Sequence, residues 1–272
     1  MSGKTIVLTG GSSGIGSATS QLLLEEGANV ISLDVKKPQA EVTRYIECDL
    51  SDLKSIDEAI HSLPDKFDSL LNIAGVPGTL DPITVMKVNF LGLVRLSEGL
   101  KEKISKNGSI VNVASIAGFN WARNIKRIID LLHVKDESEK LNWCEKENMN
   151  GDDAYSFSKE CVVVYTMLLA GDLAHKNIRC NSVSPGPVAT PLLPDFRKQT
   201  TAGQIDWLIQ KIGRAADPKE IGNVIHYLAT GPSSYINGRD IIVDGGLSAG
   251  LTMGWIDKKE SPLYQATKSN SS

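Results

Sequence analysis

Two residues that stand four positions apart, Tyr155 and Lys159, form the most chemically informative pair in this sequence. This spacing places both side chains on one face of a helix, one turn apart. A phenol has a pKa near ~10, and bringing it near ~7 requires about 4 kcal/mol. A lysine charge at ~5–6 Å supplies about 3 kcal/mol at an effective dielectric constant of ~20, and a cationic cofactor ring would supply the rest. Such a pair can exchange a proton with an alcohol or a ketone, although two residues of an ordinary amphipathic helix are the alternative.

A glycine-rich stretch, Thr9–Gly16 (TGGSSGIG), lies between a predicted strand and a predicted helix. Its glycines let the backbone turn sharply and approach a pyrophosphate, and the helix N-terminus offers unpaired N–H groups and a positive dipole end. Asp34 lies 18 positions after Gly16, where a carboxylate binds ribose hydroxyls and repels a 2′-phosphate. This favours NAD over NADP, with Lys36 and Lys37 interpreted as solvated loop residues. A tight turn without a ligand is the alternative.

Polar residues and glycines also follow the later predicted strands. Asn72–Gly75 (NIAG), Ser115 and Ser184–Gly186 end three of them, and Thr190 follows the last of these closely. Asn89 lies inside a long predicted helix, where its amide is a mediocre helix former. Because ligands of open parallel sheets bind at the carboxyl ends of the strands, these residues are expected to share one site.

Short apolar runs rich in β-formers alternate with longer helical patterns along the chain. The predicted strands are Lys4–Thr9, Asn29–Val35, Arg44–Leu50, Phe67–Ala74, Gly108–Ser115, Ile178–Ser184 and Asp240–Val243. The predicted helices are Gly14–Glu26, Asp52–Ser62, Pro82–Ile104, Asp153–His175 and Pro218–Leu228. This alternation predicts an α/β fold, a single-domain, doubly wound parallel sheet of the Rossmann type with about seven strands. Residues 1–256 are expected to form the dinucleotide-binding catalytic domain, and residues 257–272 a loosely held polar tail.

Two segments depart from regular alternation. Only 15 positions separate Asp34 from Asp49, so that crossover is cut down, whereas 40 positions separate Ser115 from Tyr155. Within the long gap one helical face collects the apolar residues Trp121, Ile125, Ile128, Ile129 and Leu132. The spacing predicts an amphipathic helix over Asn120–His133 followed by a charged loop, in an insertion of about residues 119–150.

Composition excludes several classes of protein. The 272 residues carry a formal net charge of −3, which argues against a nucleic-acid partner. No apolar run reaches the ~18–20 residues of a membrane span, and no secretory signal is recognisable. Four scattered cysteines without a CxxC pair predict reduced thiols and a cytoplasmic location. The four histidines do not have metal-ligand spacing, so no metal is expected.

Together these motifs resemble the short-chain dehydrogenase/reductase family over about Lys4–Gly250. The resemblance is carried by TGGSSGIG (Thr9–Gly16), Asp34, Asp49-Leu50, NIAG (Asn72–Gly75), VNFLG around Asn89, Ser115, YSFSK (Tyr155–Lys159), SPGPVAT (Ser184–Thr190) and VDGG (Val243–Gly246). It implies that Tyr155 is the general acid/base and that Ser115 holds the substrate oxygen. Lys159 is implied to bind the nicotinamide ribose and lower the pKa of Tyr155, and Asn89 to anchor a water in a proton relay behind Lys159.

The resemblance also implies a set of residues that contact NAD. They are Gly10, Ser12, Ser13, Gly14, Ile15, Gly16, Asp34, Asp49, Leu50, Asn72, Ala74, Gly75, Tyr155, Lys159, Pro185, Gly186, Val188 and Thr190. Asp49 and Leu50 are implied to contact the adenine, and Pro185 to Thr190 to hold the nicotinamide end.

Several departures from the family pattern look like the bacterial 3α-hydroxysteroid dehydrogenase/carbonyl reductase subgroup. These are the truncated early crossovers, among them a short step from Gly75 to Asn89, and the insertion before Tyr155. An inserted helix beside the second long helix is expected to block a common family interface, which predicts a homodimer built through the last strand and its helix. A homotetramer is the alternative. The insertion could also form a lid with Trp121 and Ile125 facing substrate, or simply pack on the body.

The predicted activity is NAD(H)-dependent interconversion of a secondary alcohol and a ketone, with Tyr155 as acid/base. Pro191–Arg214 is where the family keeps a mobile substrate loop. The inner face of this segment is expected to be apolar through Leu192, Leu193, Phe196, Trp207 and Leu208. This favours a hydrophobic substrate such as a steroid or an aromatic ketone. The alternatives are small ketones, diketones or sugars as substrates, and a non-catalytic NAD-sensing binding protein.

Overall fold

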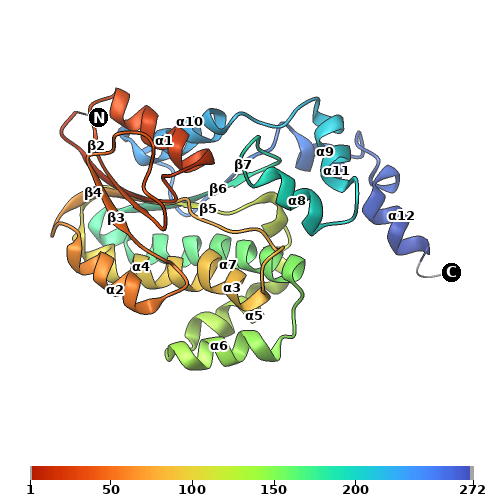
Figure 1. Ribbon diagram of the computed structural model, residues 1–272, viewed down its shortest axis with the longest axis horizontal. Helices are drawn as coiled ribbons and strands as arrows, with labels where there is room; N and C mark the ends of the chain where they lie inside the picture. The colour runs from red at the N-terminus through yellow and green to blue at the C-terminus, as the bar shows by residue number, and fades with distance from the viewer. Residues whose placement is uncertain (1, 270–272) are drawn as a thin grey trace.

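A seven-stranded parallel sheet forms the centre of the protein, with helices on both faces (Figure 1). The computed structural model describes residues 2–269. The strands are β1 (Thr5–Thr9), β2 (Asn29–Asp34), β3 (Arg44–Glu47), β4 (Phe67–Asn72), β5 (Ile104–Val113), β6 (Arg179–Pro185) and β7 (Asp240–Val243). Their order is β3-β2-β1-β4-β5-β6-β7, and every neighbouring pair is parallel. The predicted doubly wound α/β sheet is therefore confirmed.

Successive residues of the central strands belong to two different cores. In β1, Val7 packs in one core, whereas Ile6 and Leu8 pack in the other. Because side chains alternate across a strand, a strand with helices on both sides must be apolar along its whole length. The sequence run TIVLT meets this requirement.

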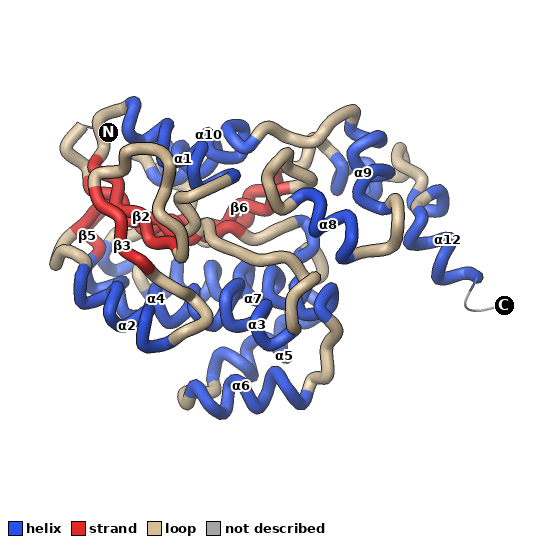
Figure 2. The backbone as a smooth tube through the Cα atoms, viewed as in Figure 1, coloured by secondary structure: helices blue, strands red, loops and turns tan. Residues whose placement is uncertain are grey.

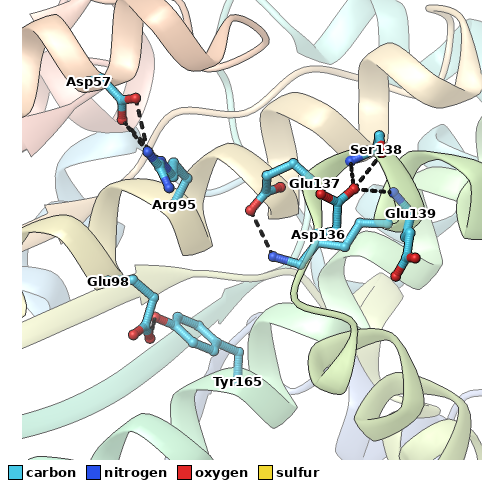
Figure 3. Close-up of polar contacts among 9 residues, drawn as sticks. Asp57, Arg95, Glu98, Asp136, Glu137, Ser138, Glu139 and Tyr165 are labelled. Atoms are coloured by element: carbon cyan, nitrogen blue, oxygen red, sulfur yellow. Dashed lines mark hydrogen bonds and ion pairs between the residues drawn. The ribbon is translucent and has the colours of Figure 1, made fainter.

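Two helical layers cover the sheet. α1 (Gly14–Glu25) and α10 (Pro218–Ala229) pack together on one face. α2 (Leu53–Ser62), α4 (Gly92–Leu100) and α7 (Gly151–Asp172) lie on the other, as Figure 2 also shows. In this second layer Arg95 pairs with Asp57 at 2.8 Å (Figure 3). The Tyr165 hydroxyl donates to Glu98 Oε1 at 2.8 Å, which joins α7 to α4 (Figure 3).

The predicted helix over Pro82–Ile104 is interrupted. It consists of α3 (Pro82–Met86), a π-helical turn η1 (Lys87–Leu91), α4, and a 3₁₀ turn η2 (Lys101–Lys103). β5 then begins at Ile104, four residues before the predicted strand. The π-helical turn contains Asn89, and such turns often mark functional sites.

The insertion before Tyr155 contains two helices. The predicted first helix is confirmed as α5 (Trp121–His133), but the predicted charged loop is wrong, because α6 (Glu137–Lys146) forms there. Asp136 caps α6 by accepting from Ser138 N at 2.9 Å and Glu139 N at 3.0 Å (Figure 3). α5 packs along α7, and the Arg127 guanidinium stacks over Phe157 at 4.1 Å. Of the predicted apolar face, Ile128 is buried whereas Ile125 is exposed.

The segment after residue 256 also contains helices. A 3₁₀ turn η6 (Lys258–Glu260) precedes α12 (Pro262–Ser269), which extends from one end of the molecule in Figure 1. Lys211 pairs with Glu260 at 2.5 Å, and Leu263 N donates to Gln204 Oε1 at 3.0 Å. These contacts hold the predicted loose tail to α9 (Gln204–Ile212), while residues 270–272 of that tail lie outside the described residues. The division at residue 256 stays a prediction.

The remaining elements are short. They are the helices α8 (Leu193–Gln199) and α11 (Leu247–Met253) and the 3₁₀ turns η3 (Ile116–Gly118), η4 (Ala174–Lys176) and η5 (Gly231–Ser233). Among the described residues, the structure contains no helix with the length and hydropathy needed to traverse a bilayer.

Candidate active site

A cleft of about 1050 Å³ opens at the carboxyl ends of the central strands. Its volume lies at the upper end of the ~300–1,000 Å³ typical of small-molecule and cofactor sites. The predicted residues that line it are Gly10, Ser12, Ser13, Gly14, Ile15, Gly16, Asp34, Asp49, Leu50, Ala74, Gly75, Ser115, Tyr155, Lys159, Pro185, Gly186, Val188 and Thr190. Residues separated by up to 180 positions in sequence thus share one cavity.

The glycine-rich turn forms one wall of the cleft. Gly10 has φ +78°, and a Cβ there would lie 2.8 Å from Ala74 Cα. A Cβ on Gly16 would lie 2.0 Å from the Gly10 carbonyl oxygen, so only glycine fits. Ser13 is the N-cap residue of α1, and its side chain makes no capping hydrogen bond. The first turn of α1 can therefore direct its amide groups at an anion in the cleft.

Asp34 stands at the end of β2, beside this turn. Its Oδ2 accepts from Ser12 N at 2.9 Å, and its Oδ1 accepts from Lys36 N at 3.0 Å. A carboxylate has about four acceptor positions, so two remain for hydroxyl groups of a ligand. Lys36 is exposed and also lines the cleft, whereas Lys37 is exposed and does not.

Tyr155 and Lys159 lie in the N-terminal part of α7, at the other end of the cleft. Lys159 Nζ donates to the Val113 carbonyl oxygen at 3.1 Å and lies 5.8 Å from the centroid of the Tyr155 ring. Ser115 lies two residues after the end of β5 and is the N-cap residue of the 3₁₀ turn η3. A Cβ on Gly118 would meet the backbone of Lys159 at 2.8 Å. Glycine at this position lets the turn that carries Ser115 approach α7 closely.

Burial is the largest influence on the pKa values of Tyr155 and Lys159. It raises the pKa of Tyr155 to about 12, against a lowering by the Ser115 hydrogen bond, and the Asp152 charge adds to the rise. Burial also lowers the pKa of Lys159 to about 8. Lys159 is expected to supply most of the shift of the Tyr155 pKa toward neutrality. In the protein alone, burial outweighs the groups that lower this pKa. Further positive charge is needed to stabilise a Tyr155 phenolate at neutral pH.

Asn89 does not line the cleft but holds its wall. Its Oδ1 accepts from Val76 N at 2.7 Å, and its Nδ2 donates to the Val76 carbonyl oxygen at 2.9 Å. Nδ2 also approaches Ser158 Oγ at 3.4 Å on α7. Asn89 thus ties the segment after β4 to the helix that carries Lys159. Its implied role as a water anchor stays a prediction.

Asn72 was expected to line the cofactor site, and the structure does not place it there. Its side chain is buried, with Nδ2 donating to Ser97 Oγ at 2.9 Å and to Asn112 Oδ1 at 2.8 Å. Because side chains alternate along β4, Asn72 faces α4 rather than the edge of the sheet. It stabilises the junction of α4 with β4 and β5.

The remaining wall comes partly from the segment expected to be apolar, because Leu192, Leu193, Phe196 and Leu208 line the cleft. Other residues of this wall were not predicted from the sequence, among them Phe119, Asp152, Gln199 and Leu251. The expected loop Pro191–Arg214 carries α8 and α9, and the Phe196 ring lies 5.3 Å from the Tyr155 ring at an interplanar angle of 59°. Trp121, Ile125 and Trp207 do not line the cleft. The position of Asp152, three residues before Tyr155 on one helix, was the available signal for that residue.

Residues 2–269 contain no candidate metal site. No group of three or more histidine, cysteine, aspartate or glutamate side chains in this range is arranged to hold an ion.

Comparison with known proteins gives matches over nearly the whole chain. Residues 4–125 match the family model described as short chain dehydrogenase, and residues 143–248 match the model described as Enoyl-(Acyl carrier protein) reductase. The coniferyl-alcohol dehydrogenase of Pseudomonas sp. (strain HR199) is 38% identical, over 92% of this chain and 98% of that protein. The 3-alpha-hydroxysteroid dehydrogenase/carbonyl reductase of Comamonas testosteroni is 27% identical, over 90% and 96% respectively.

A solved structure adds a similarity in three dimensions. The 3-alpha-hydroxysteroid dehydrogenase from Pseudomonas sp. B-0831, complexed with NADH, superposes with a TM-score of 0.80 and 29% identity. The match covers 93% of this chain and all of that one. The gap between the two family models, residues 126–142, falls inside the α5–α6 insertion.

Proposed function

The chain belongs to the short-chain dehydrogenase/reductase family, and from this premise we propose that it is an NAD(H)-dependent oxidoreductase that interconverts a hydrophobic secondary alcohol and its ketone. The observation that carries the proposal is the composition of the cleft. Tyr155, Ser115 and Lys159 line one end of the cavity, and Asp34 and the first turn of α1 line the other. A dinucleotide that spans the cleft would bring its reactive end to the acid/base group.

The residues of the cleft fit a nicotinamide dinucleotide. The uncapped first turn of α1 suits a pyrophosphate, and the glycines of Gly10–Gly16 leave room for its close approach. Asp49 and Leu50 would contact the adenine, and Pro185 to Thr190 the nicotinamide end. When bound, such a cofactor supplies the hydride acceptor for alcohol oxidation or the hydride donor for ketone reduction.

Asp34 favours NAD over NADP. Its two remaining acceptor positions suit the adenosine ribose hydroxyls, and its charge would repel a 2′-phosphate. Lys36 at the rim would reduce this repulsion only weakly, because its ammonium group is exposed and strongly hydrated.

The proton chemistry rests on Tyr155. In alcohol oxidation its phenolate would take the substrate hydroxyl proton, while Ser115 donates a hydrogen bond to the same oxygen. Lys159 would favour the phenolate through its charge, since its Nζ lies 5.8 Å from the centroid of the Tyr155 ring. Asn89 would keep Lys159 and the segment after β4 in place through its contacts with Val76 and Ser158.

An apolar wall next to Tyr155 favours a hydrophobic substrate. It includes Phe119, Leu192, Phe196, Leu208 and Leu251. The relatives are named for coniferyl alcohol and for 3-alpha-hydroxysteroids, so aromatic and steroid compounds are the first candidates. We also propose that residues 1–256 form the catalytic domain, that the protein works as a homodimer, and that it is cytoplasmic. The location is supported by four buried cysteines that form no disulfide.

The test is nicotinamide absorbance, with NADH or NADPH and a panel of 3-ketosteroids, aromatic ketones and small diketones. The alcohols of the same compounds are assayed with NAD. We expect turnover with one hydrophobic class, and loss of turnover but retained NADH binding in Tyr155→Phe. Most of the activity remaining in Tyr155→Phe would refute the acid/base role. No turnover across the panel with either cofactor would refute the proposed activity on these compounds, and NADH binding without turnover would favour the binding-protein alternative.

A further inference from the structure

We infer that Gln199 is a positioning residue that fastens α8 across the substrate end of the cleft and so places Phe196 against Tyr155. This inference rests on the proposed function, because it concerns how the same site holds its substrate. The contacts of Gln199 join three segments that are remote in sequence.

The Gln199 amide uses both of its ends. Its Oε1 accepts from Gly78 N at 2.7 Å, and its Nε2 donates to Asp152 Oδ1 at 2.7 Å. An N–H donor on one side and a carboxylate on the other fix the orientation of the amide group. α8 is thereby linked to the segment after β4 and to the first turn of α7.

The two segments that receive Gln199 are fixed to each other. A Cβ on Gly78 would lie 2.3 Å from the Gly151 carbonyl oxygen, and a Cβ on Gly151 would lie 1.9 Å from the Gly78 carbonyl oxygen. Only two glycines allow the backbones to cross so closely. The short segment before Asn89 and the end of the insertion before Tyr155, two of the departures from the usual family lengths, meet at this crossing.

α8 itself has few other polar contacts. None of its residues is fully buried. In the described part of the chain, its other side-chain polar contacts are the Arg197–Asp206 pair with α9 and the Lys198–Asp195 pair within α8. Gln199 is therefore the side chain of α8 whose hydrogen bonds reach the segments that carry the catalytic group.

Phe196 lies three residues before Gln199, on the same face of α8. Its ring is 5.3 Å from the Tyr155 ring in a tilted arrangement, which is a favourable aromatic geometry. The hydrogen bonds of Gln199 thus fix the apolar surface next to the reacting hydroxyl. A bulky substrate that packs on Phe196 will depend on Gln199 more than a small one does.

Limited trypsin digestion tests the inference without any turnover, because Arg197 and Lys198 are exposed cleavage sites within α8. In Gln199→Met and in Asp152→Ala we expect cleavage at these sites to accelerate about tenfold, the effect of losing a hydrogen bond to a charged partner. Asp152→Asn keeps the acceptor oxygen, so its cleavage rate should stay close to that of the unaltered protein. Gln210→Met makes the same chemical change on the exposed side of α9 and should also leave cleavage unchanged.

Kinetics then separates positioning from a general structural role. In Gln199→Met the KM for the bulkiest accepted substrate should rise about tenfold, and kcat should change by a smaller factor. The affinity for NADH should stay within about twofold of the unaltered value. The Gln199→Met/Asp152→Ala double variant should be no worse than Gln199→Met alone, because that change already removes the link to Asp152. Additive losses, or wild-type cleavage and KM in both single variants, would overturn the inference. If the unaltered protein turns over no substrate, the proposed function fails, whereas the trypsin comparison still decides the role of Gln199.

Discussion

Lys159→Met is the change that tests most directly how the cleft prepares Tyr155 for proton transfer. Methionine has similar bulk, so the variant removes the ammonium charge and its hydrogen bond to the Val113 carbonyl oxygen while keeping the packing. Lys159 Nζ lies 5.8 Å from the centroid of the Tyr155 ring. At an effective dielectric constant of ~20 this separation corresponds to about 3 kcal/mol, or about two pKa units.

The sign of the effect follows from the charge. Removing a cation disfavours the phenolate, so the apparent pKa that governs alcohol oxidation should rise by about two units. At pH 7 and saturating NAD, kcat should then fall about 100-fold, with partial recovery as the pH rises. Burial lowers the pKa of Lys159 itself to about 8, so the wild-type protein loses this charge above that pH. The two profiles should therefore converge in alkaline solution.

The assay is kcat against pH between 6 and 10, with NAD and alcohol both saturating so that weaker cofactor binding does not enter. Lys126→Met on α5 is the matched control, because Lys126 is exposed and does not line the cleft. An unchanged apparent pKa in Lys159→Met, with only a lower plateau, would refute the electrostatic argument. It would leave Lys159 as a contact for the cofactor and a packing residue.

Three further predictions concern cofactor choice, stability and assembly. Asp34→Asn keeps an acceptor for Ser12 N but removes the charge, so isothermal titration should show NADH affinity about tenfold weaker and NADPH affinity stronger; an unchanged ratio would refute the role of Asp34. Arg127→Met removes an ion pair with Glu147 and stacking on Phe157, so the calorimetric Tm should fall by about 2–6 °C, and an unchanged Tm would show that these contacts do not stabilise the insertion. Light scattering should give twice the mass of one chain, because α5 covers part of α7 while Ile242 on β7 is exposed; a mass of four chains would contradict the expected dimer.

The acid/base pair and the phosphate turn could be predicted because their geometry is local. Residues four positions apart on a helix lie on the same face, which brings Tyr155 and Lys159 together. The glycines of Gly10–Gly16 act within one turn. The sheet was predictable for a related reason. Strands with helices on both sides are apolar along most of their length, so their number and their alternation with helices can be recognised in the sequence.

The sequence did not predict in the same way which side chains line the cleft and which join elements in the interior. Asn72 belongs to a recognisable motif, yet strand alternation turns it toward Ser97 and Asn112 instead of the cleft. The sequence of α6, ESEKLNWCEK, predicts a charged loop because its apolar pattern is weak, whereas in the folded protein Cys144 is buried and Leu141 and Trp143 pack against the core. The pKa of Tyr155 also depends on burial, which no spacing reveals.

The sequence by itself thus determined the seven strands, their alternation with helices and the residues that act through short-range geometry. Only the tertiary structure brought Gln199 to Asp152 and Gly78, across 47 and 121 positions of the chain. The physical reason is that hydrogen bonds between distant segments depend on the packing of every element between them. Local propensity specifies each element separately, whereas the fit of those elements decides which polar groups meet at the wall of the cleft.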